Sequence, residues 1–186
     1  MKIFTPKFYP STGSAIRFCF LVLIAGSISF AQAQNITFRS HLSYPSEGTA
    51  NIWGYVDTSG SEYALVGIYE GLSIVNVSDP DNPEELFMIP TESSQWHEIK
   101  TWNKHAYVSN ESGGGVLIAD LSNLPDTVTY SYFTDPGNVE IQSVHSLWID
   151  EQGYLYLFGS NYGQPNHGGA DIYDLNPNPE QPVYIS

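Results

Sequence analysis

The amino-acid sequence predicts an all-β repeat protein, and three observations support this fold class. After the N-terminal segment, the chain consists of short runs rich in Val, Ile, Tyr and Phe, separated by Gly, Pro, Asn and Asp. No segment places apolar residues at the spacing of an amphipathic helix. A pattern of four short strands recurs three times along the chain, which is typical of repeat architectures.

The first copy of the pattern shows how each strand is predicted. A glycine turn at Gly71 separates its second and third strands. The segment 79–83 (DPDNP) ends the third strand, because proline does not donate to a β-ladder and Asp and Asn favour turns. The four predicted strands are 52–56, 63–68, 72–77 and 85–89.

The second and third copies are identified from a recurring motif. Residues 74–80 (IVNVSDP) are echoed at 118–125 (IADLSNLP) and at 172–177 (IYDLNP). Glycines again precede each motif, at 113–115 and at 168–169. The strands predicted before and after these motifs are 97–101, 105–108 and 127–133 in the second copy, and 145–149, 154–157 and 182–185 in the third.

Four antiparallel strands in roughly 40–50 residues match the period of a β-propeller blade. We therefore expect a β-propeller-like array of about three four-stranded blades, at 51–95, 96–143 and 144–186, after a lead-in at 34–50. Propellers close with about 4–8 blades, and the last residues fall within a predicted strand. The array is therefore expected to be incomplete, truncated at its C-terminus.

Residues 1–33 have the pattern of a cleavable signal peptide. Lys2, Lys7 and Arg17 form a basic region, residues 18–30 are apolar, and 31–33 (AQA) provide a small-x-small cleavage motif. An uncleaved membrane anchor is the alternative, but the apolar run is shorter than the ~20 residues that span a bilayer. We expect export.

Composition restricts the partners of the exported chain. The 186 residues include 6 basic and 20 acidic side chains, with a net charge of −14, and Lys2, Lys7 and Arg17 leave with the signal peptide. Nucleic acid and anionic membrane surfaces are therefore excluded as partners. The single cysteine, Cys19, also leaves, so packing or bound ions rather than disulfides must stabilise the remainder.

Several of these motifs resemble the LVIVD-repeat proteins, specifically the choice-of-anchor B group. The motifs concerned are 51–57 (NIWGYVD), 63–67 (YALVG), 75–80 (VNVSDP), 94–100 (SQWHEIK) and 145–153 (HSLWIDEQG). The resemblance runs from about Ser43 to the end of the chain. It implies a β-propeller-like ectodomain of a secreted or surface-attached bacterial protein, with membrane attachment only through an anchor outside this chain. It implies no activity.

Histidines are the first candidates for chemistry. His97 and His145 each open the first strand of their copy, and first strands lie nearest the axis of a propeller. With Glu98 they are candidate ligands of a divalent transition metal, or an acid/base pair, at a central channel. Trp53 is expected at the corresponding place in the first copy. The alternative is a repeated structural histidine that hydrogen-bonds the backbone of a neighbouring blade.

Two further segments are candidate sites. The third copy contains a longer loop, 159–169, in which Tyr162, Asn166 and His167 suit sugar or peptide recognition. The alternative is an insertion in an exposed turn. The segment 79–82 (DPDN) places side-chain oxygens close together and is a weak candidate for calcium, although it lacks the EF-hand spacing and is also explained as a turn.

The sequence favours a binding or scaffold module over an enzyme. It contains no nucleophile elbow, P-loop, zinc-protease or dinucleotide motif, so no catalytic residue is predicted. The four tryptophans are expected in the core between blades, and they are Trp53, Trp96, Trp102 and Trp148.

The expected partner is an extracellular protein, peptide or glycan. The first alternative is a metal-dependent enzyme that uses the histidine site. The second is a spacer module, which a smooth polar face without pockets would favour. No cofactor is expected beyond the metal or calcium of the alternatives.

Overall fold

The computed structural model describes residues 36–44, 48–161 and 169–186. The chain divides into two compact units, Met1–Phe38 and Arg39–Ser186, and every strand found lies in the second. The predicted signal peptide, 1–33, lies outside the described residues. No helix in the described part of the chain is long and apolar enough to cross a membrane.

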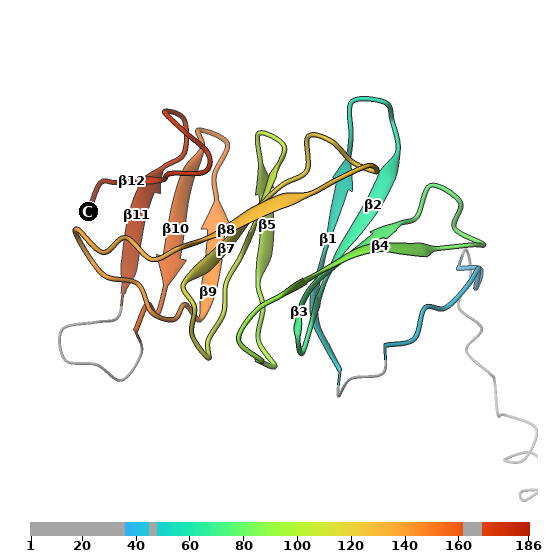
Figure 1. The fold of residues 1–186 in the computed structure, drawn as a ribbon, viewed down its shortest axis with the longest axis horizontal. Coiled ribbons are helices and arrows are strands. Elements are labelled where there is room, and N and C mark those ends of the chain that lie inside the picture. The colour runs from blue at the N-terminus through green and yellow to red at the C-terminus, as the bar shows by residue number, and fades with distance from the viewer. Residues whose placement is uncertain (1–35, 45–47, 162–168) are drawn as a thin grey trace, which may run out of the picture. The chain divides into compact units, whose positions relative to one another are not determined.

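The described residues form three four-stranded antiparallel sheets and no helix, which confirms the all-β prediction (Figure 1). In each sheet the strands follow one another in chain order. The first sheet contains β1 (Thr49–Val56), β2 (Glu62–Ile68), β3 (Gly71–Asn76) and β4 (Glu84–Pro90). The second contains β5 (Ile99–Trp102), β6 (His105–Val108), β7 (Val116–Asp120) and β8 (Thr129–Phe133). The third contains β9 (Ser146–Ile149), β10 (Tyr154–Phe158), β11 (Ala170–Asp174) and β12 (Val183–Tyr184).

Some strand boundaries differ from the predictions. β1 begins at Thr49, two residues before the boundary predicted for the first repeat. β5 and β9 begin after His97 and His145, so neither histidine opens its strand as predicted. Beside His97 one backbone bond continues the ladder, from the Ser109 N–H to the Glu98 carbonyl oxygen at 3.0 Å. Side chains make the other contacts, because Ser109 Oγ accepts the Glu98 N–H and Ser109 O lies 2.9 Å from His97 Nδ1.

The glycines of the first two copies have a common structural reason. Gly71 and Gly115 both lie where the chain enters the third strand of a sheet, and both have positive φ angles, +150° and +74°. A Cβ atom would lie 2.0 Å from the Ile89 carbonyl oxygen at Gly71 and 2.3 Å from the Phe133 oxygen at Gly115. Only glycine lets the fourth strand pass this close to the turn.

The strand register defines positions that are equivalent in the three sheets. We call a rung the residues that pair across the first, second and third strands of one sheet. The three equivalent rungs are Trp53–Leu65–Ile74, Lys100–Tyr107–Ile118 and Trp148–Tyr156–Ile172. The prediction that Trp53 corresponds to His97 and His145 is therefore wrong. Each histidine lies three residues before the first residue of its rung, and Ala50 is the residue at that distance before Trp53.

Neighbouring sheets pack face to face around two apolar cores. β5 lies between β1 and β9 and contacts both (Figure 1). Leu65 and Ile74 of the first sheet pack with Val108 of the second, and all three are buried. Tyr107 and Ile118, on the opposite face of the second sheet, belong with residues of the third sheet to the other core. Each such side chain contributes about 1.5–3 kcal/mol through burial.

The outward face of the first sheet is covered by the predicted lead-in. Leu42 and Tyr44 pack against an apolar cluster that includes Val66 and Val75. The Tyr44 hydroxyl lies 2.9 Å from Ser73 Oγ, which ties the lead-in to β3. On the third sheet, Trp148 and Phe158 of the outward face are exposed in the described structure.

Candidate functional site

The first positions of the three rungs meet in a stack centred on Lys100. Its Nζ atom lies 4.3 Å from the ring centroid of Trp53 and 5.6 Å from that of Trp148. Nζ also donates to the Ile99 carbonyl oxygen over 3.0 Å and contacts the Glu98 carboxylate. A buried ammonium needs such partners, so the stack is a structural element that joins the three sheets.

His97 and His145 lie in different environments although their positions are equivalent. His97 is buried, with Nδ1 2.9 Å from the Ser109 carbonyl oxygen, and its Cβ packs so closely on Gly67 that a side chain there would clash. His97 Nε2 makes no hydrogen bond of ordinary geometry with any described residue, although the Tyr69 backbone lies near it. Burial lowers the pKa of His97, and the Ser109 and Tyr69 backbones offset this only in part. His97 is therefore held neutral.

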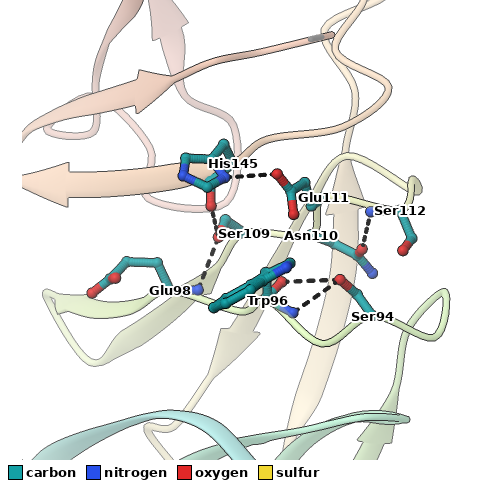
Figure 2. A network of polar contacts seen from close by, with 8 residues as sticks. All are labelled: Ser94, Trp96, Glu98, Ser109, Asn110, Glu111, Ser112 and His145. Carbon is teal, nitrogen blue, oxygen red and sulfur yellow. Dashed lines mark hydrogen bonds and ion pairs between the residues drawn. The ribbon is translucent and has the colours of Figure 1, made fainter.

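His145 is exposed, and its Nδ1 lies 2.7 Å from Glu111 Oε1. Figure 2 shows this pair beside Ser109, whose hydroxyl links the backbones of His145 and Glu98. The Glu98 side chain extends away from the pair in the same view and contacts Lys100 instead.

The three predicted metal ligands, His97, Glu98 and His145, therefore have other partners in the structure. Among the described residues, the trio of ligand atoms that lie within 4.8 Å of one another belongs to His105, Asp120 and Glu180. Metal binding by the predicted trio stays a prediction. No sequence pattern singles out His105, because its pairing with Asp120 follows only from the register of β6 and β7.

The two remaining candidate sites are the loop of the third copy and the calcium segment 79–82. Tyr162, Asn166 and His167 lie outside the described residues. In the calcium candidate, both Asp81 oxygens accept hydrogen bonds from Arg39, at 2.7 and 2.6 Å. Asp79 accepts the Asp81 N–H and the Asn82 side-chain amide, which is the bonding of a turn. Calcium binding there stays a prediction.

Three connected grooves form a polar surface at the ends of the strands, which we call the Trp96 surface. Their volumes are about 270, 500 and 430 Å³. Ser94, Gln95 and Trp96 line the first and second grooves, and Glu111 and Ser112 line the second and third. No Lys or Arg of the described residues lines any of the three.

Trp96 is the most exposed of the four tryptophans, with 59% of its surface accessible. The prediction that all four lie in the core is wrong for Trp96 and for Trp148, which is 50% exposed. Ser94 Oγ accepts the Trp96 N–H at 3.1 Å and lies 3.2 Å from the Trp96 carbonyl oxygen, so the backbone that presents the ring is fixed (Figure 2). The polar composition of 93–95 (SSQ) before this tryptophan is the signal that sequence reasoning missed.

Hydrogen bonds between segments hold the loops of the Trp96 surface in place. Asn110 donates from its side chain to the Glu92 carbonyl oxygen and accepts the Ser112 N–H at 2.7 Å. The Asn110 carbonyl oxygen accepts the Val144 N–H at 2.8 Å, which connects the second sheet to the segment before β9. The surface is therefore largely preformed rather than assembled by a ligand.

A larger groove, of about 610 Å³, lies beside the lead-in. Its walls include Leu42, Tyr44, Val66 and Val75, which also form the apolar cluster under the lead-in. This groove is explained by the packing of the lead-in on the first sheet, so we do not assign it a ligand.

Comparison with known proteins identifies no relative. No family model matches the chain, and neither a curated protein nor a solved structure matches it. The fold and the site must therefore be interpreted from the chain's own residues.

Proposed function

We propose that this chain is an exported, propeller-like binding module and that the Trp96 surface recognises an extracellular glycan. The observation that carries the proposal is the exposed Trp96 ring on a preformed polar surface. An indole face stacks on the apolar face of a sugar ring, while hydroxyl and amide groups around it bind the sugar hydroxyls. Ser93, Gln95 and Ser112 supply such groups in the groove that Trp96 and Glu111 also line.

Charge restricts the ligand to neutral or cationic chemistry. Glu111 and Glu140 line the grooves, and the whole chain carries a net charge of −14. An anionic glycan would be repelled, so neutral or amino sugars fit best. A cationic peptide is the other ligand class that this charge admits, and the binding test separates the two.

The propeller-like architecture is supported by the equivalent rungs, which repeat with the same register in three successive sheets. Export is supported by the basic, apolar and small-residue pattern of 1–33. The connected grooves favour a binding module over a spacer with a smooth polar face. The metal-dependent enzyme is less well supported, because Glu98 and His145 have the separate partners Lys100 and Glu111.

The test is a binding screen of the full chain against neutral, amino and acidic glycans and cationic peptides, followed by calorimetry with Trp96→Ala. We expect a neutral or amino glycan to bind and the substitution to weaken binding about tenfold, near 1.4 kcal/mol. Phe158→Ala is the matched control, because Phe158 is also an exposed aromatic residue but lines none of the three grooves. Equal losses in the two variants, or binding of peptides alone, would contradict the glycan assignment.

A further inference from the structure

A histidine and two carboxylates converge at the junction of the second and third sheets. His105 is the first residue of β6 and pairs with Asp120, the last residue of β7. Glu180 comes from the turn between β11 and β12. His105 Nε2 lies 3.6 Å from Glu180 Oε1 and 4.0 Å from Asp120 Oδ1. None of the three lines the grooves of the Trp96 surface.

The histidine tautomer leaves a ligand atom facing the carboxylates. His105 Nδ1 lies 2.8 Å from the Asn103 carbonyl oxygen, which can only accept, so Nδ1 carries the proton. In the neutral ring, Nε2 therefore directs a lone pair towards two negative groups. A metal-binding histidine typically has this arrangement, with its second nitrogen donating to a backbone carbonyl. A cation between the three atoms would turn repulsion into attraction.

The carboxylates are held in place by neighbours on both sheets. Asp120 Oδ1 accepts the Ser122 N–H at 2.8 Å. Tyr107 donates its hydroxyl proton to the Pro179 carbonyl oxygen over 2.7 Å, which fixes the turn that carries Glu180.

The size of the site suits a small ion. Ligands about 2.0–2.1 Å from a tetrahedral zinc lie roughly 3.3 Å apart. His105 Nε2 lies 3.6 Å from the Glu180 oxygen and 4.0 Å from the Asp120 oxygen, so these two distances exceed the zinc spacing by about 0.3 and 0.7 Å. Glu180 has 56% of its side chain exposed and is free to move closer to His105. A cavity of about 130 Å³ lined by Asp120, Tyr130 and Glu180 leaves room for a coordinating water.

We propose that His105, Asp120 and Glu180 bind a divalent first-row transition metal, best Zn²⁺, which clamps the second sheet to the third. One imidazole and two carboxylates are ligands that zinc accepts, whereas the nitrogen ligand disfavours calcium and magnesium. After loss of Cys19 the chain has no cysteine, so such a clamp replaces the cross-link that a disulfide would supply. The clamp does not depend on the glycan proposal.

The test is calorimetric titration of the metal-stripped, tag-free full chain with Zn²⁺, together with thermal melting and Co²⁺ absorption spectra. We expect one ion per chain, a higher melting temperature with metal, and Co²⁺ bands of low coordination number. His105→Ala and Asp120→Asn should each weaken Zn²⁺ binding at least a hundredfold. Glu180→Gln, which changes an exposed side chain, should weaken Zn²⁺ binding about tenfold.

The matched controls are His145→Ala and Glu111→Gln, which remove an exposed histidine–carboxylate pair without touching the trio. Both should bind Zn²⁺ as the unaltered chain does. The proposal is overturned if the chain binds neither Zn²⁺ nor Co²⁺, or if Glu180→Gln and Asp120→Asn bind as tightly as the unaltered chain. It is also overturned if His97→Ala and His145→Ala alone abolish binding, which would instead favour the histidine site expected from the sequence.

Discussion

Tyr107 and Tyr156 occupy the same place in the rungs of the second and third sheets, but only Tyr107 is buried. The same contrast holds for Ile118, which is buried, and Ile172, which is half-buried. The third sheet covers this face of the second sheet, while its own equivalent face carries the exposed Trp148. Equivalent positions in a repeat therefore share backbone register but not environment, because the environment is supplied by the neighbouring sheet.

The largest expected effect is a difference in the free energy of unfolding between substitutions at Ile118 and at Ile172. Ile118→Ala should lower the free energy of unfolding by about 2–5 kcal/mol, because it leaves a cavity between two sheets. Ile172→Ala should cost less than half as much, because its site is already partly open to water. Urea unfolding of both variants measures the difference. Equal losses would show that the outward face of the third sheet is covered in solution.

Loss of the central charge should have the next largest effect. Lys100→Met keeps the apolar stem but removes the cation between Trp53 and Trp148 and leaves Glu98 without its partner. We expect a loss of about 1–3 kcal/mol in the free energy of unfolding. Lys104→Met, at an exposed position, should change it by no more than about 0.5 kcal/mol. If the Lys100 variant were as stable as the Lys104 variant, the stack would not contribute to the stability of the fold.

The smallest expected effect is a dependence of the free energy of unfolding on pH, and it comes from His97. Burial lowers the pKa of His97 in the folded state, so the unfolded chain takes up a proton more readily. The stability contributed by neutral His97 is present above the pKa of histidine in the unfolded chain, about 6.5. It is lost as the pH falls towards the lower pKa of His97 in the folded state. His97→Asn should flatten the dependence of the unfolding free energy on pH between about pH 7.5 and 5.5. Denaturant unfolding of the unaltered chain and of the variant across this range measures the two slopes, and equal slopes would contradict a lowered pKa of His97.

The outward faces of the first and third sheets also differ in what covers them. Leu42 and Tyr44 cover the first sheet, so a covered face is achieved there by a segment that is not itself a strand. The tyrosine hydroxyl to Ser73 and the Arg39–Asp81 pair hold that segment at two further points. The described residues of the third sheet have no such cover over Trp148.

The class of fold and the strands can be predicted from the amino-acid sequence alone. Turn residues, glycines before each third strand and alternating apolar runs are local signals, so a strand of the structure overlaps each predicted one. The same signals mislead where one residue matters. Trp53 lies near the start of its predicted strand, as the histidines do, but the register places it opposite Leu65, as Lys100 lies opposite Tyr107.

Which side chains are accessible, and which contact one another, depends on how the three sheets pack. Trp96 and Trp53 both look like core residues in the chain, yet one is exposed and the other packs beside Lys100. His105 and Asp120 are paired by a hairpin, but Glu180 reaches them only because the third sheet packs on the second. The propensity of a segment to form a strand depends on its near neighbours in the chain, so short sequence patterns reveal it. Burial and the grouping of metal ligands depend on contacts between distant segments, and no short pattern encodes those contacts.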